Sequence, residues 1–208
     1  MKQQKHLGVA SFNCISALIE LSKKQLKAIN NLGVTLELKS QITLSSRINL
    51  MYDLHDYVSN TDLTRYALIA RQIEEANKGK WKEHFRLCHG DMWVENIMVN
   101  HESKTVLIDF DKVLYFHPAF DYCYLYIMES EEVRGTDLKS KLSFFDFLVD
   151  DLINLVKDDL KFTVFDIKMC LLTVFFLKLS ERDFYQKKFG YCLVEIENVL
   201  NKILIEHQ

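Results

Sequence analysis

The sequence predicts a mostly α fold of the α+β class, with a small β insert near its centre. Only 6 of the 208 residues are glycine and only one is proline. The chain therefore has few residues that end helices or form tight turns. Apolar residues recur at helical spacing on both sides of the centre. Between residues 85 and 108, three short apolar runs separated by polar loops are instead typical of strands.

The first segments along the chain are expected to be helical, with one exception. Alternating polar and apolar residues at Val34–Leu44 indicate a hairpin or irregular chain. Apolar spacing close to 3.6 residues predicts the helices, and Gly33 and Gly79 stand where two of them would stop. The predicted helices are Ser11–Leu32, Ile48–Tyr57 and Thr61–Asn77, the last with a polar start at Ser59–Asp62.

The β insert and the segments behind it follow the same reasoning. Short apolar runs predict three strands at Phe85–Cys88, Ile97–Val99 and Val106–Ile108. After Pro118 the chain returns to helical spacing, with amphipathic stretches at Leu142–Leu160, Val164–Leu179 and Tyr185–Ile205. No internal repeat or low-complexity linker is visible, so we expect one domain over residues 1–208.

The composition narrows the class of protein. With 49% hydrophobic residues and a formal charge of −3, the chain is an ordinary globular domain with no basic surface to attract nucleic acid. No signal-peptide pattern is present, and the longest uncharged apolar run, Met169–Leu177, is about half of what a membrane helix needs. We therefore expect a cytoplasmic protein that contacts neither nucleic acid nor membrane.

The cysteines and histidines do not form a recognisable metal site. The cysteines never occur as C-x-x-C, so neither a disulfide framework nor a zinc site is indicated, and we expect them to be buried. They are Cys14, Cys88, Cys123, Cys170 and Cys192. Four histidines that lack metal-ligand spacing are expected on the surface or in loops. They are His55, His84, His101 and His117.

Polar residues that carry chemistry concentrate between Cys88 and Tyr122. Asp91 and Asn96 stand in the arrangement H-x-D-x-x-x-x-N, on a loop that leaves one predicted strand and enters the next. The protein-kinase catalytic loop uses this spacing because its Asp must reach the acceptor hydroxyl while its Asn turns back to a metal on the phosphates. The spacing therefore favours phosphoryl transfer.

A second acidic element follows the third predicted strand. Val106–Ile108 is expected to be a buried strand that ends in Asp109, and a carboxylate there is well placed to offer hard oxygen ligands to Mg²⁺. A hairpin of the flanking strands would bring Asp91, Asn96 and Asp109 to one edge. Phosphoryl transfer needs positioning and charge neutralisation, and these residue types supply both.

These motifs resemble the aminoglycoside phosphotransferase and choline kinase type of family, which shares the protein-kinase-like fold. The matching elements are His89-Gly90-Asp91 with Asn96-Ile97, Ile108-Asp109-Phe110, and His117-Pro118-Ala119-Phe120-Asp121. The form Ile108-Asp109-Phe110-Asp111 also resembles spore-coat-type members of that family. The resemblance covers about residues 85–128. It implies the helical C-terminal lobe of a kinase-like fold with a small central β-hairpin or sheet.

The resemblance also implies roles for individual residues. Asp91 would be the catalytic base, and Asn96 and Asp109 would be the magnesium ligands. His89 would support the loop as a scaffold residue, and Asp121 would bond to backbone around the catalytic loop. The cofactors implied are Mg²⁺ and ATP as phosphoryl donor, and the residues that would bind the nucleotide are not indicated.

Two further residues in this segment have open roles. Asp111 would lie on the same side as Asp109 if the strand continued, and would then support the metal site; otherwise it is exposed to solvent. Trp93 lies inside the loop, where it either packs under the loop or lines the acceptor pocket. Acidic residues Glu129–Glu132 with Asp137 would attract a cationic acceptor or, as we favour, form a solvated helix end.

The chain departs from a complete kinase-like enzyme in its first half. No G-x-G-x-x-G loop is present, since Gly8 and Gly33 stand alone, and no V-A-I-K-like lysine is recognisable, Lys39 being a poor candidate. We therefore expect the C-terminal lobe alone, with the N-terminal nucleotide lobe absent and supplied, if at all, by a separate polypeptide or an oligomer partner.

The sequence thus predicts an ATP- and Mg²⁺-dependent phosphotransferase acting on a hydroxyl of a small molecule. The alternative is a catalytically inactive kinase-like binding or spore-coat-type protein, and a purely structural helical domain would leave Asp91, Asn96 and Asp109 without a role. The acceptor stays open among choline, ethanolamine, thiamine, sugars, aminoglycosides and macrolides, because helices build acceptor pockets through contacts that one sequence does not reveal.

Overall fold

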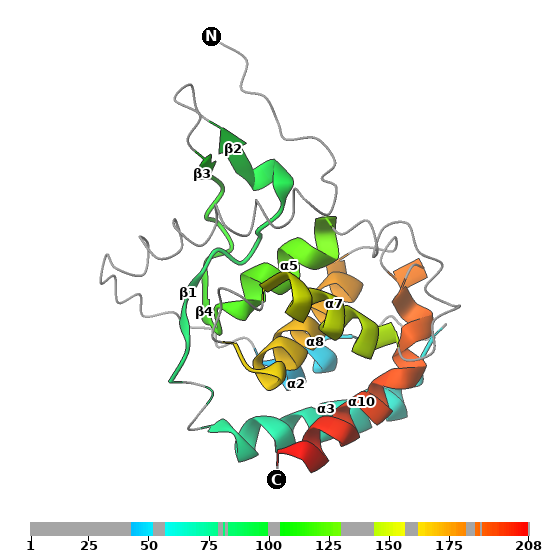
Figure 1. Ribbon diagram of the computed structural model, residues 1–208. Coiled ribbons are helices and arrows are strands. Elements are labelled where there is room, and N and C mark those ends of the chain that lie inside the picture. The colour runs from blue at the N-terminus through cyan, green and yellow to red at the C-terminus, as the bar shows by residue number, and fades with distance from the viewer. Residues whose placement is uncertain are drawn as a thin grey trace.

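The computed structural model describes residues 43–51, 57–78, 81, 83–99, 105–129, 144–156, 162–181, 186–187 and 189–207. Figure 1 shows helices that surround a central helix pair, with the strands at one end. The helices are α2 (Leu44–Asn49), α3 (Asn60–Ala76), α5 (Ala119–Glu129), α7 (Phe144–Val156), α8 (Val164–Glu181) and α10 (Leu193–Glu206). The strands are β1 (Arg86–Cys88), β2 (Ile97–Val99), β3 (Thr105–Leu107) and β4 (Leu114–Phe116), and 3₁₀ turns lie at η1 (Val94–Asn96) and η3 (Gly190–Cys192). The predicted mostly α class with a small β insert is confirmed.

The four strands form two antiparallel pairs rather than one sheet. Strand β1 pairs with β4, with Cys88 opposite Leu114, and β2 pairs with β3, with Ile97 opposite Leu107. The chain therefore runs out from the first pair to the second and returns. The outgoing segment 89–96 and the returning segment 108–113 connect the same two sheets, so they lie opposite each other.

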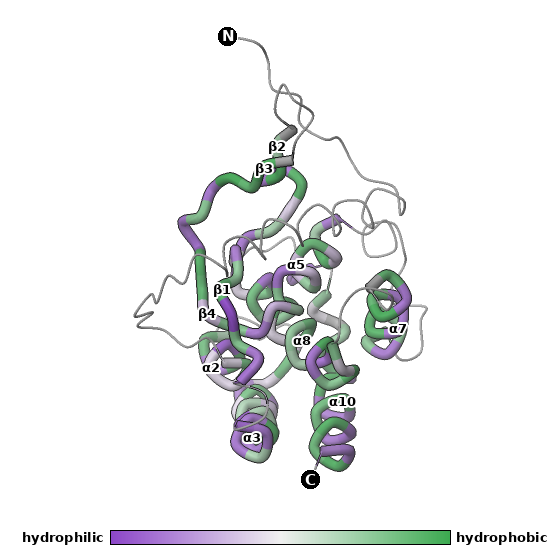
Figure 2. Tube along the Cα trace, turned by 60° about the vertical axis from the view of Figure 1, so that its left-hand side comes forward, coloured by the Kyte–Doolittle hydropathy of each residue, from purple (hydrophilic) through white to green (hydrophobic). Residues whose placement is uncertain are grey.

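Helices α5 and α8 form the centre of the core. They pack against each other, and every residue of α8 from Phe165 to Leu179 is buried. Nearly every residue of α5 is buried as well, whereas Figure 2 shows hydrophilic residues alternating with hydrophobic ones along α3 and α10. A helix that is apolar all round belongs in the interior, and a helix with one polar face belongs at the surface. The core therefore sits directly behind the strands.

Side chains at the helix starts explain where two helices begin. The side chain of Thr43 accepts a hydrogen bond from the backbone N–H of Ser46, and the Ser46 hydroxyl accepts one from the backbone N–H of Thr43. Together they form a capping box before α2. Ser59 accepts from the N–H of Asp62 in the same way at α3. The polar start predicted at Ser59–Asp62 is thus the cap of α3.

Several predicted boundaries are confirmed and others are wrong. Thr61–Asn77 and Val164–Leu179 correspond to α3 and α8 within two residues, and the three predicted strands correspond to β1, β2 and β3 within one. The helix predicted at Ile48–Tyr57 is wrong at its start, because the capping box starts α2 at Leu44 and this helix ends at Asn49; residues 52–56 of the predicted range lie outside the described residues. The helix predicted at Ser11–Leu32, most of the hairpin at Val34–Leu44, and Gly79 lie outside the described residues.

Strand β4 was not predicted, and one predicted helix is interrupted. The stretch Tyr185–Ile205 contains the 3₁₀ turn η3 before α10 begins at Leu193. At this turn the backbone of Gly190 meets the ring of Tyr57, and a Cβ added at Gly190 would lie 2.5 Å from that ring. The close approach of Tyr57 therefore requires a glycine at position 190.

Two composition-based expectations bear on the core and on membranes. The cysteines within the described residues, Cys88, Cys123, Cys170 and Cys192, are all buried, and no disulfide is formed among them; Cys14 lies outside those ranges. Over the part of the chain that the structure covers, none of the helices combines the length and apolarity that crossing a bilayer requires.

Candidate active site

The site is built on two facing segments of chain, the loop 89–96 and the returning segment 108–113. The backbone N–H of Ile108 donates to the carbonyl of Asn96 at 2.9 Å. The ring of His89 bonds through Nε2 to the carbonyl of Ile108 at 2.8 Å, and because a carbonyl only accepts, Nε2 carries the proton. The two segments are therefore tied together at both ends of the loop.

His89 lies where the scaffold role implied by its motif requires it. Its side chain is buried, and its ring centroid lies 4.7 Å from that of Phe110 on the facing segment. Within the described residues, its Nδ1 is one of two buried side-chain nitrogens without a hydrogen-bond partner. The ring thus joins the loop to the Ile108–Phe110 segment by one hydrogen bond and one ring contact.

Gly90 makes the close approach of the two segments possible. Its φ is +82°, and a Cβ added there would lie 2.0 Å from the backbone oxygen of Lys112. A side chain at position 90 would therefore meet both an unfavourable backbone conformation and a backbone atom that cannot move aside. This explains why a glycine stands between His89 and Asp91.

Two buried carboxylates of α5 accept hydrogen bonds from the backbone of loop 89–96. Asp121, which is fully buried, accepts the backbone N–H of His89 at 2.7 Å and that of Gly90 at 2.9 Å. Glu129, equally buried, accepts the N–H of Val94 at 3.1 Å. Asp121 thus makes the backbone contacts that its implied role requires. Glu129 belongs to this support, so the solvated helix end expected there is wrong for Glu129; residues 130–132 and Asp137 lie outside the described ranges.

Burial sets the protonation properties of the Asp121 carboxyl. Desolvation raises its pKa to about 6, and the two backbone N–H donors, which favour the charged form, limit the rise. The carboxylate form is the one that accepts both hydrogen bonds. Burial and the two N–H donors therefore act on this carboxyl in opposite directions, and burial has the larger effect.

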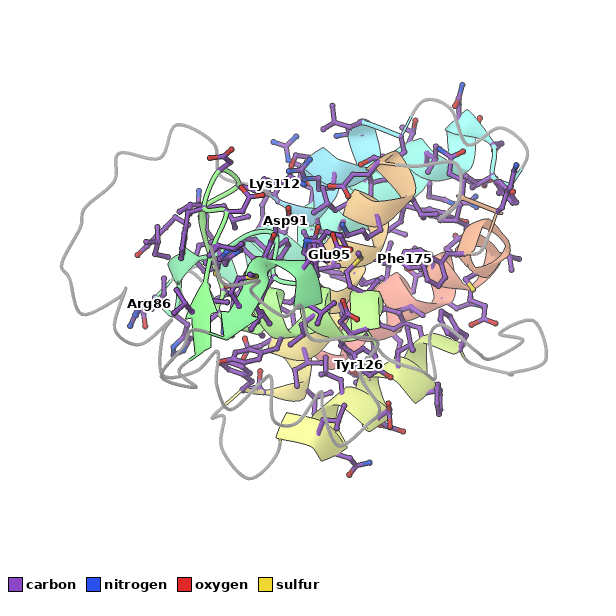
Figure 3. The ribbon with its side chains drawn as sticks, turned by 90° about the horizontal axis from the view of Figure 1, so that it is seen from above. Arg86, Asp91, Glu95, Lys112, Tyr126 and Phe175 are labelled. Carbon is purple, nitrogen blue, oxygen red and sulfur yellow. The ribbon has the colours of Figure 1, made fainter. Side chains whose placement is uncertain are left out.

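Asp91 lies at the point where the loop, the returning segment and the helical core meet. Its Oδ1 accepts a short hydrogen bond from the hydroxyl of Tyr124 on α5. Its Oδ2 lies 3.2 Å from Nζ of Lys112, whose side chain is 55% exposed, whereas that of Asp91 is 14% exposed. Figure 3 shows Lys112 and Asp91 next to each other, with Glu95 close by.

The surroundings of Asp91 favour its charged form. Burial alone would raise the pKa of its carboxyl, but the hydrogen bond from Tyr124 and the charges of Lys112 and Lys178 together lower it below its ordinary value. Asp91 is therefore a carboxylate at neutral pH, which is the form a proton acceptor needs.

Asn96 and Asp109, the two expected magnesium ligands, lie on the two facing segments, and the carbonyl of Asn96 accepts the backbone N–H of Ile108, the residue before Asp109. Asn96 is buried, and its Nδ2 donates to the carbonyl of Asp91 at 2.8 Å, which fixes the amide. Asp109 is exposed and has a φ of +62°, the one positive φ outside glycine among the described residues. Asp tolerates this conformation better than most residues, and such outliers cluster at functional sites.

The remaining sequence-predicted residues have simpler environments. Strand β3 ends at Leu107, so the strand does not continue to Asp111, which is exposed in the following turn. Val106 and Ile108 are about 40% and 39% exposed, so the segment before Asp109 is not the buried strand expected. Trp93 is half-buried and packs against the core, which favours the position under the loop.

His117, expected on the surface or in a loop, lies in the loop between β4 and α5, where its side chain is buried. Its Nδ1 accepts the N–H of Ala119, and Nε2 faces Asp166 at 3.4 Å. Desolvation lowers the pKa of its ring to about 4, against the attraction of Asp166. His84 is exposed as expected, and His55 and His101 lie outside the described residues.

Sequence reasoning missed the residues that support Asp91 from a distance. Tyr124 lies on α5 three residues after Asp121, Lys112 lies in the turn after Asp111, and Lys178 lies on α8, far from the motifs in the sequence. The one available signal was a lysine inside the apolar run of α8, where a charge is costly unless it has a partner.

Comparison with protein families decides what kind of protein this is. Residues 27–155, more than half of the chain, match the model of the ecdysteroid kinase-like family. The chain belongs to this family. The ecdysteroid kinase-like family is a kinase-like family related to the choline kinase and aminoglycoside phosphotransferase type, so the resemblance read from the motifs is correct at that level. The matched residues include loop 89–96, Asp109 and α5, and no curated protein matches the chain.

Proposed function

We propose that this member of the ecdysteroid kinase-like family transfers the γ-phosphoryl group of ATP to a hydroxyl of a small molecule. The observation that carries the proposal is the environment of Asp91. A carboxylate that is charged at neutral pH, reachable through Oδ2 and held on a loop opposite Asp109 has the properties of a general base for a hydroxyl.

The proposed step uses groups of this chain. Asp91 accepts the proton of the acceptor hydroxyl while the acceptor oxygen bonds to the γ-phosphorus and the bond from that phosphorus to the β–γ bridging oxygen breaks. The products are the phosphorylated acceptor and ADP, and the proton on Asp91 then passes to water. Lys112, 3.2 Å from Asp91 and largely exposed, supplies a positive charge beside the reacting groups.

The donor set at the expected metal position fits Mg²⁺. Asn96 and Asp109 offer one amide oxygen and one carboxylate, and Mg²⁺ bound with nucleotides usually takes only one or two protein carboxylates beside phosphates and water. Among the described residues no group of three or more His, Cys, Asp or Glu forms a candidate site for another metal. When bound, Mg²⁺ would neutralise charge on the β- and γ-phosphates.

The family's description suggests which acceptors to test first. It reads ecdysteroid kinase-like, and an ecdysteroid is a small molecule that bears hydroxyl groups, so ecdysteroids are the first candidates. We include in the proposal that the residues binding the adenine and the α-phosphate come from outside loop 89–96 and segment 108–113, either from this chain or from a partner.

A thermal-shift titration of the full chain tests the proposal. Mg²⁺ and ATP together should stabilise the protein by about 2.7 kcal/mol at a hundredfold excess over Kd, a rise in Tm of roughly 5 to 10 °C. Asp109→Asn, which suits the positive φ and removes the charge, should abolish the Mg²⁺-dependent part of the shift. Exposed Asp146, which pairs with Lys202 at 3.2 Å, gives the control Asp146→Asn with an unchanged shift.

An activity assay completes the test. Incubation with ATP, Mg²⁺ and an ecdysteroid should yield a phosphorylated steroid, detected by a mass increase, and Asp91→Asn should lower the rate by at least about a hundredfold. A protein that shows no shift with Mg²⁺ and ATP and phosphorylates no acceptor would instead be a kinase-like binding protein.

A further inference from the structure

A buried lysine stands behind the candidate base, connected to it through one tyrosine. Lys178 lies on α8 with only 3% of its side chain exposed, and its Nζ donates to the hydroxyl oxygen of Tyr124 on α5. That hydroxyl in turn donates to Oδ1 of Asp91. Three elements, loop 89–96, α5 and α8, thus contribute one side chain each to a continuous hydrogen-bonded chain.

The direction of these hydrogen bonds is fixed by chemistry. An ammonium group only donates, so the Tyr124 oxygen must accept from Lys178. A phenol has a single proton, and with its oxygen engaged by the lysine that proton points to the carboxylate of Asp91. Lys178 therefore determines which way the Tyr124 hydroxyl is oriented.

The cost of burying Lys178 argues for a role beyond packing. Removing an ammonium group from water costs several kcal/mol, on the order given for buried ions. Glu181 compensates part of this, since its Oε2 lies 2.7 Å from Nζ, and the ring of Tyr124 lies 3.9 Å below the ammonium. An apolar residue of similar volume would fill the same space without this desolvation.

These hydrogen bonds also give the two carboxylate oxygens of Asp91 different surroundings. Oδ1 is engaged by Tyr124 in the interior, whereas Oδ2 faces Lys112, whose side chain is 55% exposed. A long and exposed lysine can move away when a substrate arrives, but a buried tyrosine held from both sides cannot. Oδ2 is therefore the oxygen that a hydroxyl group can reach.

We propose that Tyr124 and Lys178 are positioning residues that hold Asp91 through Oδ1 and leave Oδ2 as the oxygen that receives the acceptor's proton. This inference rests on the proposed function, because it assigns the reacting atom of the same site. Tyr124 and Lys178 act through Asp91 and contact neither the nucleotide nor the acceptor.

The kinetic test uses Tyr124→Phe and Lys178→Met on the full chain, with Mg²⁺, ATP and water as the acceptor. A misplaced catalytic group slows the chemical step but leaves nucleotide binding unchanged. We therefore expect kcat to fall by about tenfold to a hundredfold while KM for ATP stays within about twofold. Lys178→Arg keeps the charge and should recover part of kcat. An equal loss in Lys178→Arg and Lys178→Met, or a rise in KM alone, would overturn the proposal.

The matched control is Tyr126→Phe, on the same helix. Tyr126 is also buried, and its hydroxyl donates to Asp151 at 2.6 Å. Figure 3 shows Tyr126 well apart from Asp91. Removing this hydroxyl deletes a buried hydrogen bond of the same kind, so it reports the effect of stability alone, and kcat should not change. A loss of kcat equal to that of Tyr124→Phe would contradict a specific role for Tyr124.

A spectroscopic measurement separates this inference from the proposed function. With ¹³C-labelled aspartate carboxyls at one neutral pH, Asp91→Asn identifies the Asp91 resonance. Tyr124→Phe and Lys178→Met should both move that resonance, and Tyr126→Phe should leave it in place. If the wild type shows no shift with Mg²⁺ and ATP and phosphorylates no acceptor, the proposed function fails and this resonance still decides the contact. If the resonance ignores Tyr124→Phe and Lys178→Met, the positioning role is wrong even in an active enzyme.

Discussion

At the scale of single residues, the candidate site depends on positions where the backbone adopts a conformation that most side chains avoid. Gly90 and Asp109 both have positive φ, at +82° and +62°, and they lie on the two segments that face each other. Gly90 lets the segments approach, and Asp109 presents its carboxylate from the returning segment. The local geometry around Asp91 thus depends on backbone as much as on side chains.

Gly90→Ala should be among the most damaging small substitutions in the protein. The added Cβ would lie 2.0 Å from the Lys112 oxygen at a φ of +82°, so we expect a loss of about 3 kcal/mol or more in unfolding free energy. Urea denaturation measures this loss. Because the Lys112 backbone must shift, the Lys112–Asp91 ion pair should also be lost, and kcat should fall.

The control for this prediction is Gly190→Ala. Its Cβ would meet the ring of Tyr57 at 2.5 Å, so it also lowers stability, but it lies on η3 near α10. Activity under conditions where both variants are folded should be normal in Gly190→Ala. Normal activity in folded Gly90→Ala would show that the close approach of the two segments is not needed for the reaction.

At the scale of elements, α5 is the support of loop 89–96. Asp121, Tyr124 and Glu129 are separated by three and five residues, which places them on one broad side of a helix. All three bond to loop 89–96, to the backbone at both ends and to the side chain of Asp91 between them. Tyr126 falls on another side of α5 and bonds to Asp151 on α7 instead.

Glu129→Ala should loosen one end of the loop. It leaves the buried N–H of Val94 without the carboxylate that accepts from it at 3.1 Å, at a cost of about 2 kcal/mol. Hydrogen exchange of the Val94 amide should therefore become faster. Asp146→Ala, which removes an exposed ion pair with Lys202, should cost no more than about 0.5 kcal/mol. Unchanged exchange at Val94 would mean that other contacts hold this end of the loop.

The same helix shows which parts of the site could be predicted from sequence. Asp91, Asn96, Asp109 and Asp121 belong to short motifs, whose spacing is preserved in the folded loops. Tyr124, Glu129 and Lys178 depend on the packing of α5 and α8 against the loop, which no local pattern encodes. Lys178 directly follows the apolar run Met169–Leu177, and Glu129 was expected at a solvated helix end. Neither position indicates a buried charge, because a buried charge is recognisable only by its distant partner.

The fold was predictable to a similar degree. Periodicity located α3, α8 and the first three strands, because each of these buries one regular face or a continuous apolar run. Strand β4 lies in the apolar run Val113–Phe116, but it is a strand only because β1 pairs with it across 28 residues. The interruption of the predicted helix Tyr185–Ile205 at Gly190 also depends on a distant contact, since Tyr57 comes from a remote part of the chain.

At the scale of the whole molecule, buried titratable groups give the stability a dependence on pH. The pKa of His117 is about 4 in the fold and about 6.5 in an unfolded chain. Since its folded pKa is depressed, its contribution to stability is present above pH 6.5 and is lost as the pH falls through about 4. Asp121 acts in the opposite direction, because its pKa is raised from 3.8 to about 6. Its contribution to the free energy of unfolding is present below pH 3.8 and is lost as the pH rises through about 6.

His117→Asn isolates the first of these two effects. Asn keeps an oxygen that can accept the N–H of Ala119, but it does not titrate. The stability advantage of the wild type over this variant should shrink by up to about 3 kcal/mol between pH 6.5 and pH 4. Urea denaturation at several pH values measures it, and Asp121 contributes equally to both proteins. Parallel stability curves would show that His117 does not protonate on unfolding.

The support of loop 89–96 by later segments of the chain has a consequence for how the candidate site forms during synthesis. The bonds from Asp121, Tyr124 and Glu129 to loop 89–96 span between 31 and 35 residues, and Tyr124 meets Lys178 only after another 54. Closing such long stretches of chain is slow compared with forming a helix turn. Loop 89–96 leaves the ribosome before α5 and α8, and we expect it to become ordered around Asp91 only as these helices dock, so the candidate site should be a late product of folding.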